Sequence, residues 1–324
     1  MSDAFDLLIV GDANPDIVLH GAPLELAYGQ VEQLAESGAL TVGGSAGIMA
    51  CAAARLGLRT AFASVVGDDA GGRFMLGELT RRGVHVSGVA VRREVSTGLT
   101  VALTRGDDRA IITFPGCIDA LTAEVVEGSL VRGARHVHVS SFYLQPRLAS
   151  GLRGLFEAAH AAGAGTSLDL NWDPSGQWDG GLADVLPAVD VLFVNAAEAT
   201  AVSGASDPAV AATVLAARGP LPVIKLGAAG ALAHDGCRLV RVTAPAVTVV
   251  DTVGAGDSFD AGFLCGRLLG WEVSRSLALG VACGSASACG AGGIDAQPTR
   301  AAALAMVDDL LTLPGADAGP ECAP

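Results

Sequence analysis

The stretch at residues 250–263, VDTVGAGDSFDAGF, places small residues directly before a carboxylate and then an apolar run. Gly254, Ala255 and Gly256 allow a tight turn, and the apolar residues that follow repeat at helical spacing, so a helix is predicted to start near Gly256. The first amides of a helix lack partners and suit a bound phosphate. Asp257, beside them, could accept a proton from an attacking alcohol. On this stretch alone, Asp257 could equally be a helix-start residue favoured by the helix dipole.

A second candidate is Lys225, the only lysine of the chain, in the stretch IKLGAAGAL. It stands at the end of a predicted strand, just before Gly227 and Gly230, and open α/β sheets bind ligands at such strand ends. Asn195 and Glu198, in FVNAAEA, occupy another predicted strand-to-helix junction. They could organise the water shell of Mg²⁺ or form a helix capping box, and their spacing alone favours the capping box.

Polar side chains also follow two other predicted strands. Asp12, Asn14 and Asp16 lie in GDANPD, and Asp169 and Asn171 follow the strand-like segment TSLDL. A carboxylate in either place could accept hydrogen bonds from ligand hydroxyls. The alternative is that these residues only form Asx-turns or cap a turn.

The segment at residues 43–47, GGSAG, matches the G-x-S-x-G pattern of a serine nucleophile. A serine hydrolase built on Ser45 would need an acid and one of His138, His160 or His234 further along the chain. No Walker A loop, protein-kinase signature, HExxH motif or Cys/His metal spacing occurs in the sequence. Any phosphate must therefore be held by helix ends, Mg²⁺, arginines or the single lysine.

These candidates need a scaffold, and strand-like and helix-like segments alternate along most of the chain. Helices are predicted at 48–56 and up to residue 82, and buried strands at 7–12, 60–66, 136–139, 165–170, 189–194 and 221–226. This alternation predicts an α/β fold in which helices cover both faces of a parallel sheet. His136 and His138 alternate along one predicted strand, and we expect one to face the core and the other to be exposed.

Residues 17–42 and 91–114 break this rhythm, because they contain short strand-like pieces without long helices. The pieces STGLTVALTR and RAIITF flank a hairpin turn at Gly106-Asp107-Asp108. We interpret the two inserts as a small β-sheet that lies over the main sheet as a lid and excludes water from a site. Edge strands of one large sheet are an equally good interpretation of the pattern.

The composition limits the class of protein. The 324 residues are 51% hydrophobic and 4% aromatic, which allows a sizeable core of Ala, Val and Leu. The net charge of −14 disfavours nucleic acid or an anionic membrane as a partner. Seven cysteines without a CxxC pair, and no basic segment before the first apolar run, predict a cytoplasmic protein without a signal peptide. The uncharged segment Ser276–Ile294 suits a tightly packed buried helix better than a membrane span.

Several of these motifs occur in one order along the chain. GG at 43, Gly-Asp-Asp at 67, N-x-x-E at 195, K-L-G-x-x-G at 225 and D-T-x-G-A-G-D-x-F at 251 together resemble the PfkB, or ribokinase-like, carbohydrate kinase family over about residues 5–310. The resemblance implies a ribokinase-like, Rossmann-type α/β three-layer sandwich with a small β-sheet lid. It divides the chain into a large nucleotide- and substrate-binding domain (1–16, 43–90 and 115–313), a discontinuous β lid (17–42 and 91–114) and a flexible tail (314–324).

The resemblance also implies the reaction, which is transfer of the ATP γ-phosphate to a hydroxyl of a sugar or nucleoside. By motif position, Asp257 is the general base and Gly254, Ala255 and Gly256 form the anion hole. The residues implied at the acceptor are Asn14, Asp16, Gly43, Gly44, Ser45, Ile48, Phe114, Asp169 and Asn171.

The nucleotide and its metal ion have implied positions too. Asn195 and Glu198 organise Mg²⁺ and the phosphates, Glu198 acting through water, and this role replaces the capping box. The resemblance allows a monovalent cation such as K⁺ beside the Asp251 loop, and a homodimer formed through the lid. The residues implied at the nucleotide are Asn195, Glu198, Lys225, Gly227, Gly230, Asp251, Thr252, Val281 and Gly284.

Three positions depart from the family pattern and bear on the acceptor. Many relatives have Asn at the position of Ile48, and ribokinases have Lys at the position of Ser45, which implies a less polar or differently shaped acceptor. Kinases of keto-deoxy sugar acids carry Arg at the position of Asp173, which implies a neutral acceptor here. The alternatives are an adenosine-type nucleoside kinase of the same fold, a serine hydrolase that uses Ser45, and a sugar-binding protein without activity.

Overall fold

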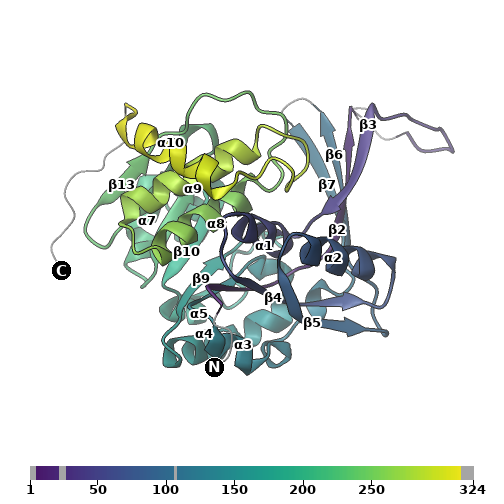
Figure 1. Ribbon diagram of the computed structural model, residues 1–324, viewed down its shortest axis with the longest axis horizontal. Helices are drawn as coiled ribbons and strands as arrows, with labels where there is room; N and C mark the ends of the chain where they lie inside the picture. Colours follow the sequence, from purple (N-terminus) through teal and green to yellow (C-terminus); the bar gives the residue numbers. More distant parts are fainter. Residues whose placement is uncertain (1–4, 22–26, 106–107, 315–324) are drawn as a thin grey trace.

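The computed structural model describes residues 5–21, 27–105 and 108–314, and its largest element is a nine-stranded sheet (Figure 1). The strand order is β13-β12-β11-β10-β9-β8-β1-β4-β5. Neighbouring strands from β5 to β11 pair in parallel, and β12 and β13 add antiparallel strands at one edge. The strands are β1 (Leu7–Val10), β4 (Thr60–Gly67), β5 (His85–Arg92), β8 (His136–Val139), β9 (Gly165–Asp169), β10 (Val191–Asn195), β11 (Leu221–Lys225), β12 (Ala231–His234) and β13 (Leu239–Val242).

Helices cover both faces of this sheet, as the apolar strands require. One hydrophobic cluster contains residues of α1 (Ser45–Arg55), α2 (Ala70–Arg81), α8 (Ala255–Leu268), α9 (Val273–Ser287) and α10 (Arg300–Thr312). The other contains residues of α3 (Gly128–Gly133), α4 (Pro146–Ala161), α5 (Leu182–Val185), α6 (Ala196–Ser203) and α7 (Pro208–Ala216). The predicted three-layer α/β sandwich is confirmed.

A second, four-stranded sheet stands beside the large domain (Figure 1). Its order is β3-β2-β6-β7, built from β2 (Pro15–His20), β3 (Ser37–Val42), β6 (Leu99–Arg105) and β7 (Asp108–Phe114). The two inserts thus form a separate small sheet, as expected, and the alternative of edge strands in one large sheet is wrong. Residues 106–107 of the expected hairpin turn and the tail beyond residue 314 lie outside the described residues.

The segment rich in small residues near the C-terminus packs closely against α8. A Cβ atom added at Gly262 of α8 would lie 2.7 Å from the backbone oxygen of Leu279 in α9, so only glycine allows this approach. Most of α9 is buried, in agreement with the buried helix predicted for residues 276–294, although the helix ends at Ser287. None of the described helices has the length and apolar character needed to cross a membrane.

The prediction that one of His136 and His138 is exposed is wrong, because their exposed fractions are 8% and 0%. Side chains two positions apart in a strand point to the same face, and β8 lies inside the sheet. The Ser167 hydroxyl is 2.8 Å from a ring nitrogen of each histidine, and Ser140 Oγ is 2.9 Å from His138 Nε2. Burial lowers the pKa of His136 to about 4 and that of His138 to about 3, so both rings are neutral at pH 7.

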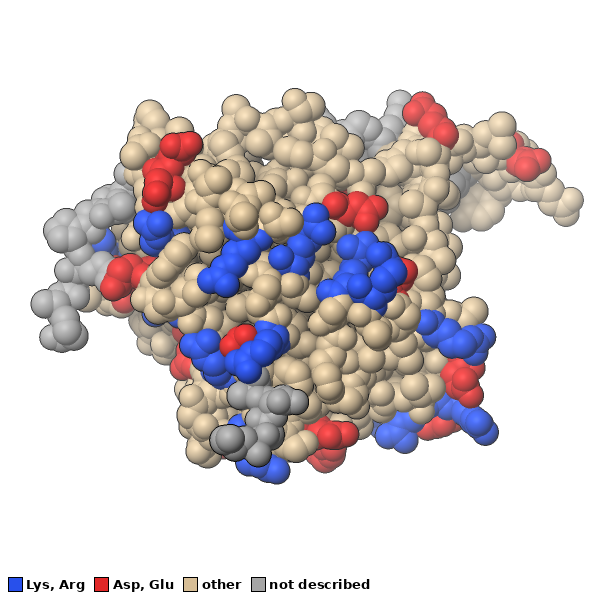
Figure 2. Space-filling model, viewed as in Figure 1, with Lys and Arg blue, Asp and Glu red and all other residues tan. Residues whose placement is uncertain are grey.

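Acidic and basic side chains lie close together on the face of the molecule shown in Figure 2, where patches of Lys and Arg extend across the middle. Several arginines of the described residues are paired with acids. Arg82 Nη2 lies 3.1 Å from Asp295 Oδ1, and Arg275 Nη1 lies 3.0 Å from Asp308 Oδ1. Exposed pairs of this kind contribute at most about 1 kcal/mol each. These arginines are therefore matched locally by acids, within a chain whose net charge is −14.

Candidate active site

The stretch at residues 250–263 forms a tight turn followed by α8, which begins at Ala255. Gly254 has φ 70° and ψ 1°, a left-handed conformation, and a Cβ added there would lie 2.6 Å from the Gly293 oxygen and 2.8 Å from Ile48 Cγ2. Glycine is therefore required at this point of the turn. The first amides of α8 have no intrahelical acceptor, and the positive end of the helix dipole lies at the same place.

A cavity of about 760 Å³ lies at this helix N-terminus. Its size is in the range of small-molecule and cofactor sites. Lys225, Asp251 and Thr252 contribute polar groups, and Thr104 reaches it from the small sheet. The lining residues that the sequence predicted for the anion hole or the nucleotide are Ala255, Gly256, Lys225, Gly227, Gly230, Asp251, Thr252, Val281 and Gly284. Sequence reasoning missed the apolar wall, which contains Val247, Val249, Val250 and Phe259.

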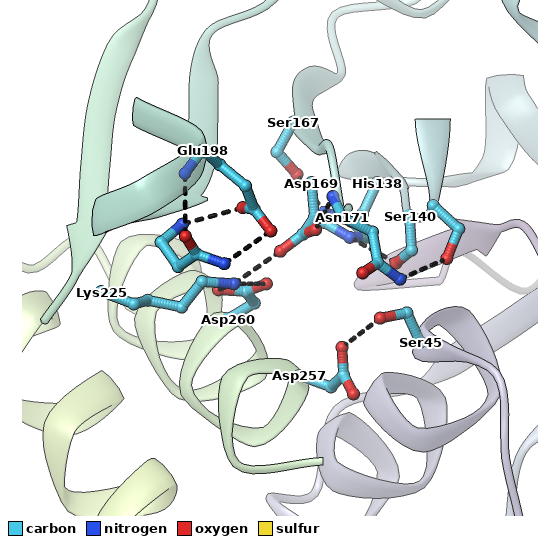
Figure 3. Close-up of polar contacts among 12 residues, drawn as sticks. Ser45, His138, Ser140, Ser167, Asp169, Asn171, Glu198, Lys225, Asp257 and Asp260 are labelled. Atoms are coloured by element: carbon cyan, nitrogen blue, oxygen red, sulfur yellow. Dashed lines mark hydrogen bonds and ion pairs between the residues drawn. The ribbon is translucent and has the colours of Figure 1, made fainter. Parts of the chain in front are cut away.

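Asp257 lies in the first turn of α8 and faces the start of α1 (Figure 3). The Ser45 hydroxyl donates a hydrogen bond of 2.6 Å to Asp257 Oδ1. Asp257 Oδ2 has no hydrogen-bond partner among the residues that the structure describes. Burial raises the pKa of Asp257 to about 7, while the Ser45 hydrogen bond acts in the opposite direction. The carboxylate is thus available to exchange a proton near neutral pH.

Lys225, Asp169 and Asp260, here called the Lys225 cluster, form a buried group of charges beside this turn (Figure 3). Lys225 Nζ lies 2.6 Å from Asp169 Oδ2 and 3.2 and 3.1 Å from the two oxygens of Asp260. The Asp260 side chain is only 1% exposed. A Cβ added at Gly256 would lie 3.4 Å from Lys225 Nζ, so the ammonium group sits beside the N-terminus of α8.

The charges of the Lys225 cluster shift one another's pKa values. Burial alone would lower the pKa of Lys225, but the carboxylates of Asp169 and Asp260 outweigh burial and raise it. Burial raises the pKa of Asp260 well above its usual value. Burial also acts to raise the pKa of Asp169, but Lys225 and a hydrogen bond from Asp260 leave it lowered. The lysine and Asp169 are therefore the ionised pair, and Asp260 is the carboxyl group that retains a proton most readily.

Asn195 and Glu198 form the capping box of α6 that their spacing suggested. Asn195 Oδ1 accepts from the Glu198 amide at 2.9 Å, and Glu198 Oε2 accepts from the Asn195 amide at 2.9 Å. Burial raises the pKa of Glu198 to about 7. Neither residue lines the cavity, so neither is placed to contact a ligand bound in it directly.

The residues predicted at the acceptor join the large domain to the small sheet. Asn14 Nδ2 donates to Asp16 Oδ1 and to Thr100 Oγ1 of β6, both at 3.0 Å. The Gly43 amide donates to the Asn14 oxygen at 3.0 Å. Phe114 is the last residue of β7 and is 55% exposed. These hydrogen bonds hold β2 against β6 and against the turn that precedes α1. Ser45, the first residue of α1, contacts Asp257.

The end of β9 and the loop that follows it hold three further predicted residues in different ways. Asp169 is engaged by Lys225, as described above. Asn171 has φ 56° and donates to Ser141 Oγ at 3.3 Å. Asp173 is buried and accepts from the amides of Ser175 and Trp178 at 2.8 and 2.7 Å. Its carboxylate therefore orders this loop, a role that the sequence did not suggest.

Two other predicted residues lie beneath the α8 turn. Ile48 is 3% exposed and belongs to the core that packs under Gly254. Asp251 Oδ1 accepts from the Val253 amide at 2.9 Å, and its Oδ2 accepts from the Gly292 amide at 3.0 Å. Within residues 5–21, 27–105 and 108–314, no group of three His, Cys, Asp or Glu side chains could hold a metal ion.

The sequence did not indicate Asp260 as a candidate, and it did not indicate the role that Asp12 has in the structure. Asp260 lies three residues after Asp257, and this spacing, which puts both on one side of α8, was the available signal. Asp12 was considered only as a hydroxyl ligand or turn residue. In the structure its carboxylate accepts from the amides of Ser45 and Ala46, both at 3.1 Å, and so caps α1.

A helix N-terminus beside a carboxylate and a nucleotide-sized cavity meets the needs of phosphoryl transfer to an alcohol. Together with the two-sheet fold, it defines a ribokinase-like kinase of small molecules. The model of the "pfkB family carbohydrate kinase" matches residues 4–300. The chain belongs to this family and is an ATP-dependent sugar or nucleoside kinase.

Named relatives agree with this assignment. Fructoselysine 6-kinase of Shigella flexneri is 32% identical over 252 residues, which cover 74% of this chain and 87% of that protein. ATP-dependent ribose-1-phosphate kinase of Halopiger xanaduensis is 30% identical over 307 residues, covering 94% and 98% of the two chains. The solved structure of Arabidopsis thaliana ribokinase with ribose and ATP is similar with a TM-score of 0.81 at 26% identity, covering 94% of this chain and 99% of that one.

Proposed function

We propose that this kinase transfers the γ-phosphate of ATP to a hydroxyl group of a neutral sugar, sugar alcohol or nucleoside, with Asp257 as the general base. The observation that carries the proposal is the position of Asp257 in the first turn of α8, with one carboxylate oxygen unpartnered among the described residues. A dedicated nucleoside kinase of the same fold is the second candidate. The serine hydrolase is disfavoured, because the Ser45 hydroxyl contacts Asp257, whereas His138 contacts Ser140 and Ser167.

The proposed step uses the unpartnered oxygen of the base. As the acceptor oxygen attacks the γ-phosphorus, its O–H bond breaks and the proton moves to Asp257 Oδ2. A new O–P bond forms, and the bond from the γ-phosphorus to its bridging oxygen breaks with the electron pair leaving on ADP. Gly254, Ala255 and Gly256 form the anion hole, in which the amides at the start of α8 stabilise the equatorial oxygens of the transferring group.

We assign ATP to the cavity of about 760 Å³ at the N-terminus of α8, with its phosphates towards Gly256 and Lys225. Mg²⁺, when bound, neutralises phosphate charge and keeps most of its own waters. We assign Glu198 to this ion through water, together with Asn195, because a buried carboxyl near the Lys225 cluster suits an outer-sphere contact. K⁺ is assigned to the Asp251 loop, where both oxygens of Asp251 accept hydrogen bonds from backbone amides.

A neutral acceptor fits the charges around Asp257. Asp12, Asp16 and Asp257 are all acidic, and Lys225 is already paired with Asp169. Two relatives, fructoselysine 6-kinase and ribose-1-phosphate kinase, are named for charged acceptors. Charged sugars are therefore included in the test. The remaining residues assigned to the acceptor are Asn14, Gly43, Gly44, Ser45, Ile48, Phe114, Asp169 and Asn171.

The small sheet is proposed to act as a lid over the acceptor and as the contact of a homodimer. Exposed apolar side chains on its edge strands, including Leu40, Ile112 and Phe114, with exposed fractions of 54%, 58% and 55%, support a role in closure or pairing. Sedimentation equilibrium of the wild type and of Ile112→Lys tests the dimer. A monomeric wild type would contradict it.

The acceptor is identified by ADP release across neutral sugars, sugar alcohols, nucleosides, sugar acids and sugar phosphates. Thermal stabilisation with a non-hydrolysable ATP analogue provides an independent measure of binding. Turnover on a neutral acceptor is expected, and it should disappear in Asp257→Asn while stabilisation by the nucleotide remains. Best turnover on a sugar acid would contradict the neutral acceptor, and sugar-induced stabilisation without ADP release would indicate a binding protein.

A further inference from the structure

The Ser45 hydroxyl and the Asp257 carboxylate meet across the site although 212 positions separate them in the chain (Figure 3). Their contact of 2.6 Å is in the range of hydrogen bonds from a hydroxyl to an ionised carboxylate. Ser45 begins α1 and Asp257 lies in the first turn of α8, so two helix N-termini converge here. The residue pair therefore joins two rigid elements.

Ser45 is itself held in place by the large domain. Asp12, which follows β1, accepts hydrogen bonds of 3.1 Å from the amides of Ser45 and Ala46. Asp12 is 4% exposed, and burial raises the pKa of its carboxyl while these amides act to lower it. The Ser45 hydroxyl is thus presented to Asp257 from an anchored helix start rather than from a mobile loop.

We propose that Ser45 is a positioning residue for the phosphoryl transfer: its hydroxyl fixes Oδ1 of Asp257, so that Oδ2 is turned towards the acceptor and remains ionised. This inference rests on the proposed role of Asp257 as the base, and it assigns Ser45 to the base instead of to the acceptor. A carboxylate with one oxygen fixed loses less rotational freedom when the acceptor binds.

The surroundings of Asp257 explain why the hydrogen bond is needed. Burial, together with the carboxylates of Asp169 and Asp12, makes ionisation of Asp257 less favourable, and Lys225 partly compensates. Asp260, on the next turn of α8, is also acidic. The hydrogen bond from the Ser45 hydroxyl favours the charged form of Asp257. Its removal should leave the base protonated over a wider range of pH.

The test compares Ser45→Ala with Ser45→Thr, which keeps the hydroxyl group. The dependence of kcat on pH is measured by ADP release at saturating ATP and acceptor. In Ser45→Ala, the acidic limb should move upward by about one pH unit, and kcat at pH 7 should therefore fall about fivefold. Ser45→Thr should keep the limb near that of the wild type. An unchanged limb in Ser45→Ala would overturn the inference.

A matched control removes a serine hydroxyl that makes an equally short bond elsewhere. Ser64 Oγ donates to the Gly11 oxygen at 2.6 Å and is buried, but it does not contact Asp257. Ser64→Ala should leave the acidic limb in place even if the protein is destabilised. A higher KM for the acceptor with unchanged kcat in Ser45→Ala would mean that Ser45 contacts the acceptor, and would also overturn the inference.

A readout without turnover separates this inference from the proposed function. The thermal midpoint is measured between pH 5 and 9 for Asp257→Asn and for its parent, in the wild-type and in the Ser45→Ala background. The gap between parent and Asp257→Asn reports the cost of ionising Asp257, and in the Ser45→Ala background it should keep growing to higher pH and be larger at pH 9. Equal gaps overturn the Ser45 inference alone, whereas full turnover by Asp257→Asn overturns the proposed base and the inference together.

Discussion

The carboxyl groups of Asp257 and Asp260 lie one helical turn apart on α8 and have different partners. The Asp257 carboxylate contacts a neutral hydroxyl, has one oxygen without a partner among the described residues, and has a pKa of about 7. In the Lys225 cluster, Asp260 is almost fully buried and its two oxygens lie 3.2 and 3.1 Å from an ammonium group. Asp257 can change its protonation near pH 7, whereas in the Lys225 cluster Lys225 and Asp169 form the ion pair and Asp260, whose pKa burial raises, retains its proton.

This difference shows how one helix can carry a reactive acid and a structural one. A buried ion pair keeps its members charged, so it would prevent a base from taking up a proton. A hydroxyl partner orients a carboxylate without supplying a full opposite charge. Substitutions in the two groups should therefore separate activity from stability, and the following experiments test that separation.

The largest effect on activity is expected for Asp257→Asn. Loss of the base should lower kcat by about 10²–10⁴-fold. Stability should change in the opposite direction, because the pKa of Asp257 is raised from 3.8 to about 7 on folding, so the folded state loses stability as the pH rises from about 4 to about 7. At pH 8 the thermal midpoint of Asp257→Asn should equal or exceed that of the wild type. A large fall in the midpoint would show that Asp257 is structural.

Lys225→Met should mainly affect stability. It leaves Asp169 and Asp260 buried together without their cation, and breaking such a pair costs about 3–5 kcal/mol. Urea unfolding at pH 7.5 measures this loss, and Arg153→Met, at an exposed ion pair on α4, is the control with an expected loss below about 1 kcal/mol. Equal losses in the two variants would contradict the comparison.

The two acids of the Lys225 cluster should differ from each other. Asp169→Asn removes the charge paired with Lys225 at 2.6 Å, and we expect a loss of roughly 3 kcal/mol. Asp260 has the raised pKa and readily retains a proton, so Asp260→Asn should cost only about 1 kcal/mol. Urea unfolding of both variants decides the order, and a greater loss in Asp260→Asn would reverse the assignment of the ionised partner.

The smallest expected effect is on the pH dependence of activity, which distinguishes Asp257 from Glu198 as the titrating group. Because Asp257 must be ionised to act as a base, kcat/KM should fall about tenfold per pH unit below pH 7. Glu198 also has a pKa raised to about 7, so a pH profile of Glu198→Gln separates the two. Gln can retain much of the capping box. The limb should persist in this variant, and its disappearance would assign it to Glu198.

Much of the scaffold could be predicted because it depends on local patterns. Apolar runs such as Leu7–Val10 and Leu221–Lys225 become buried parallel strands, and the turn before α8 follows from the glycines. The strands β5, β12 and β13 were not predicted, because their apolar runs are short. The histidines of β8 were misjudged for a geometric reason, since residues two apart share a face.

The sequence by itself determined the family, the parallel α/β core and the candidate base, because each is encoded within a short run of residues or in the order of such runs. The tertiary structure alone decided the partners of the charged groups. Lys225 meets Asp169 and Asp260 from positions 56 and 35 residues away, and Asp257 meets Ser45 across 212 residues. The physical reason is that a pattern specifies backbone conformation locally, whereas the environment of a buried charge depends on which strand ends and helix starts the fold brings together.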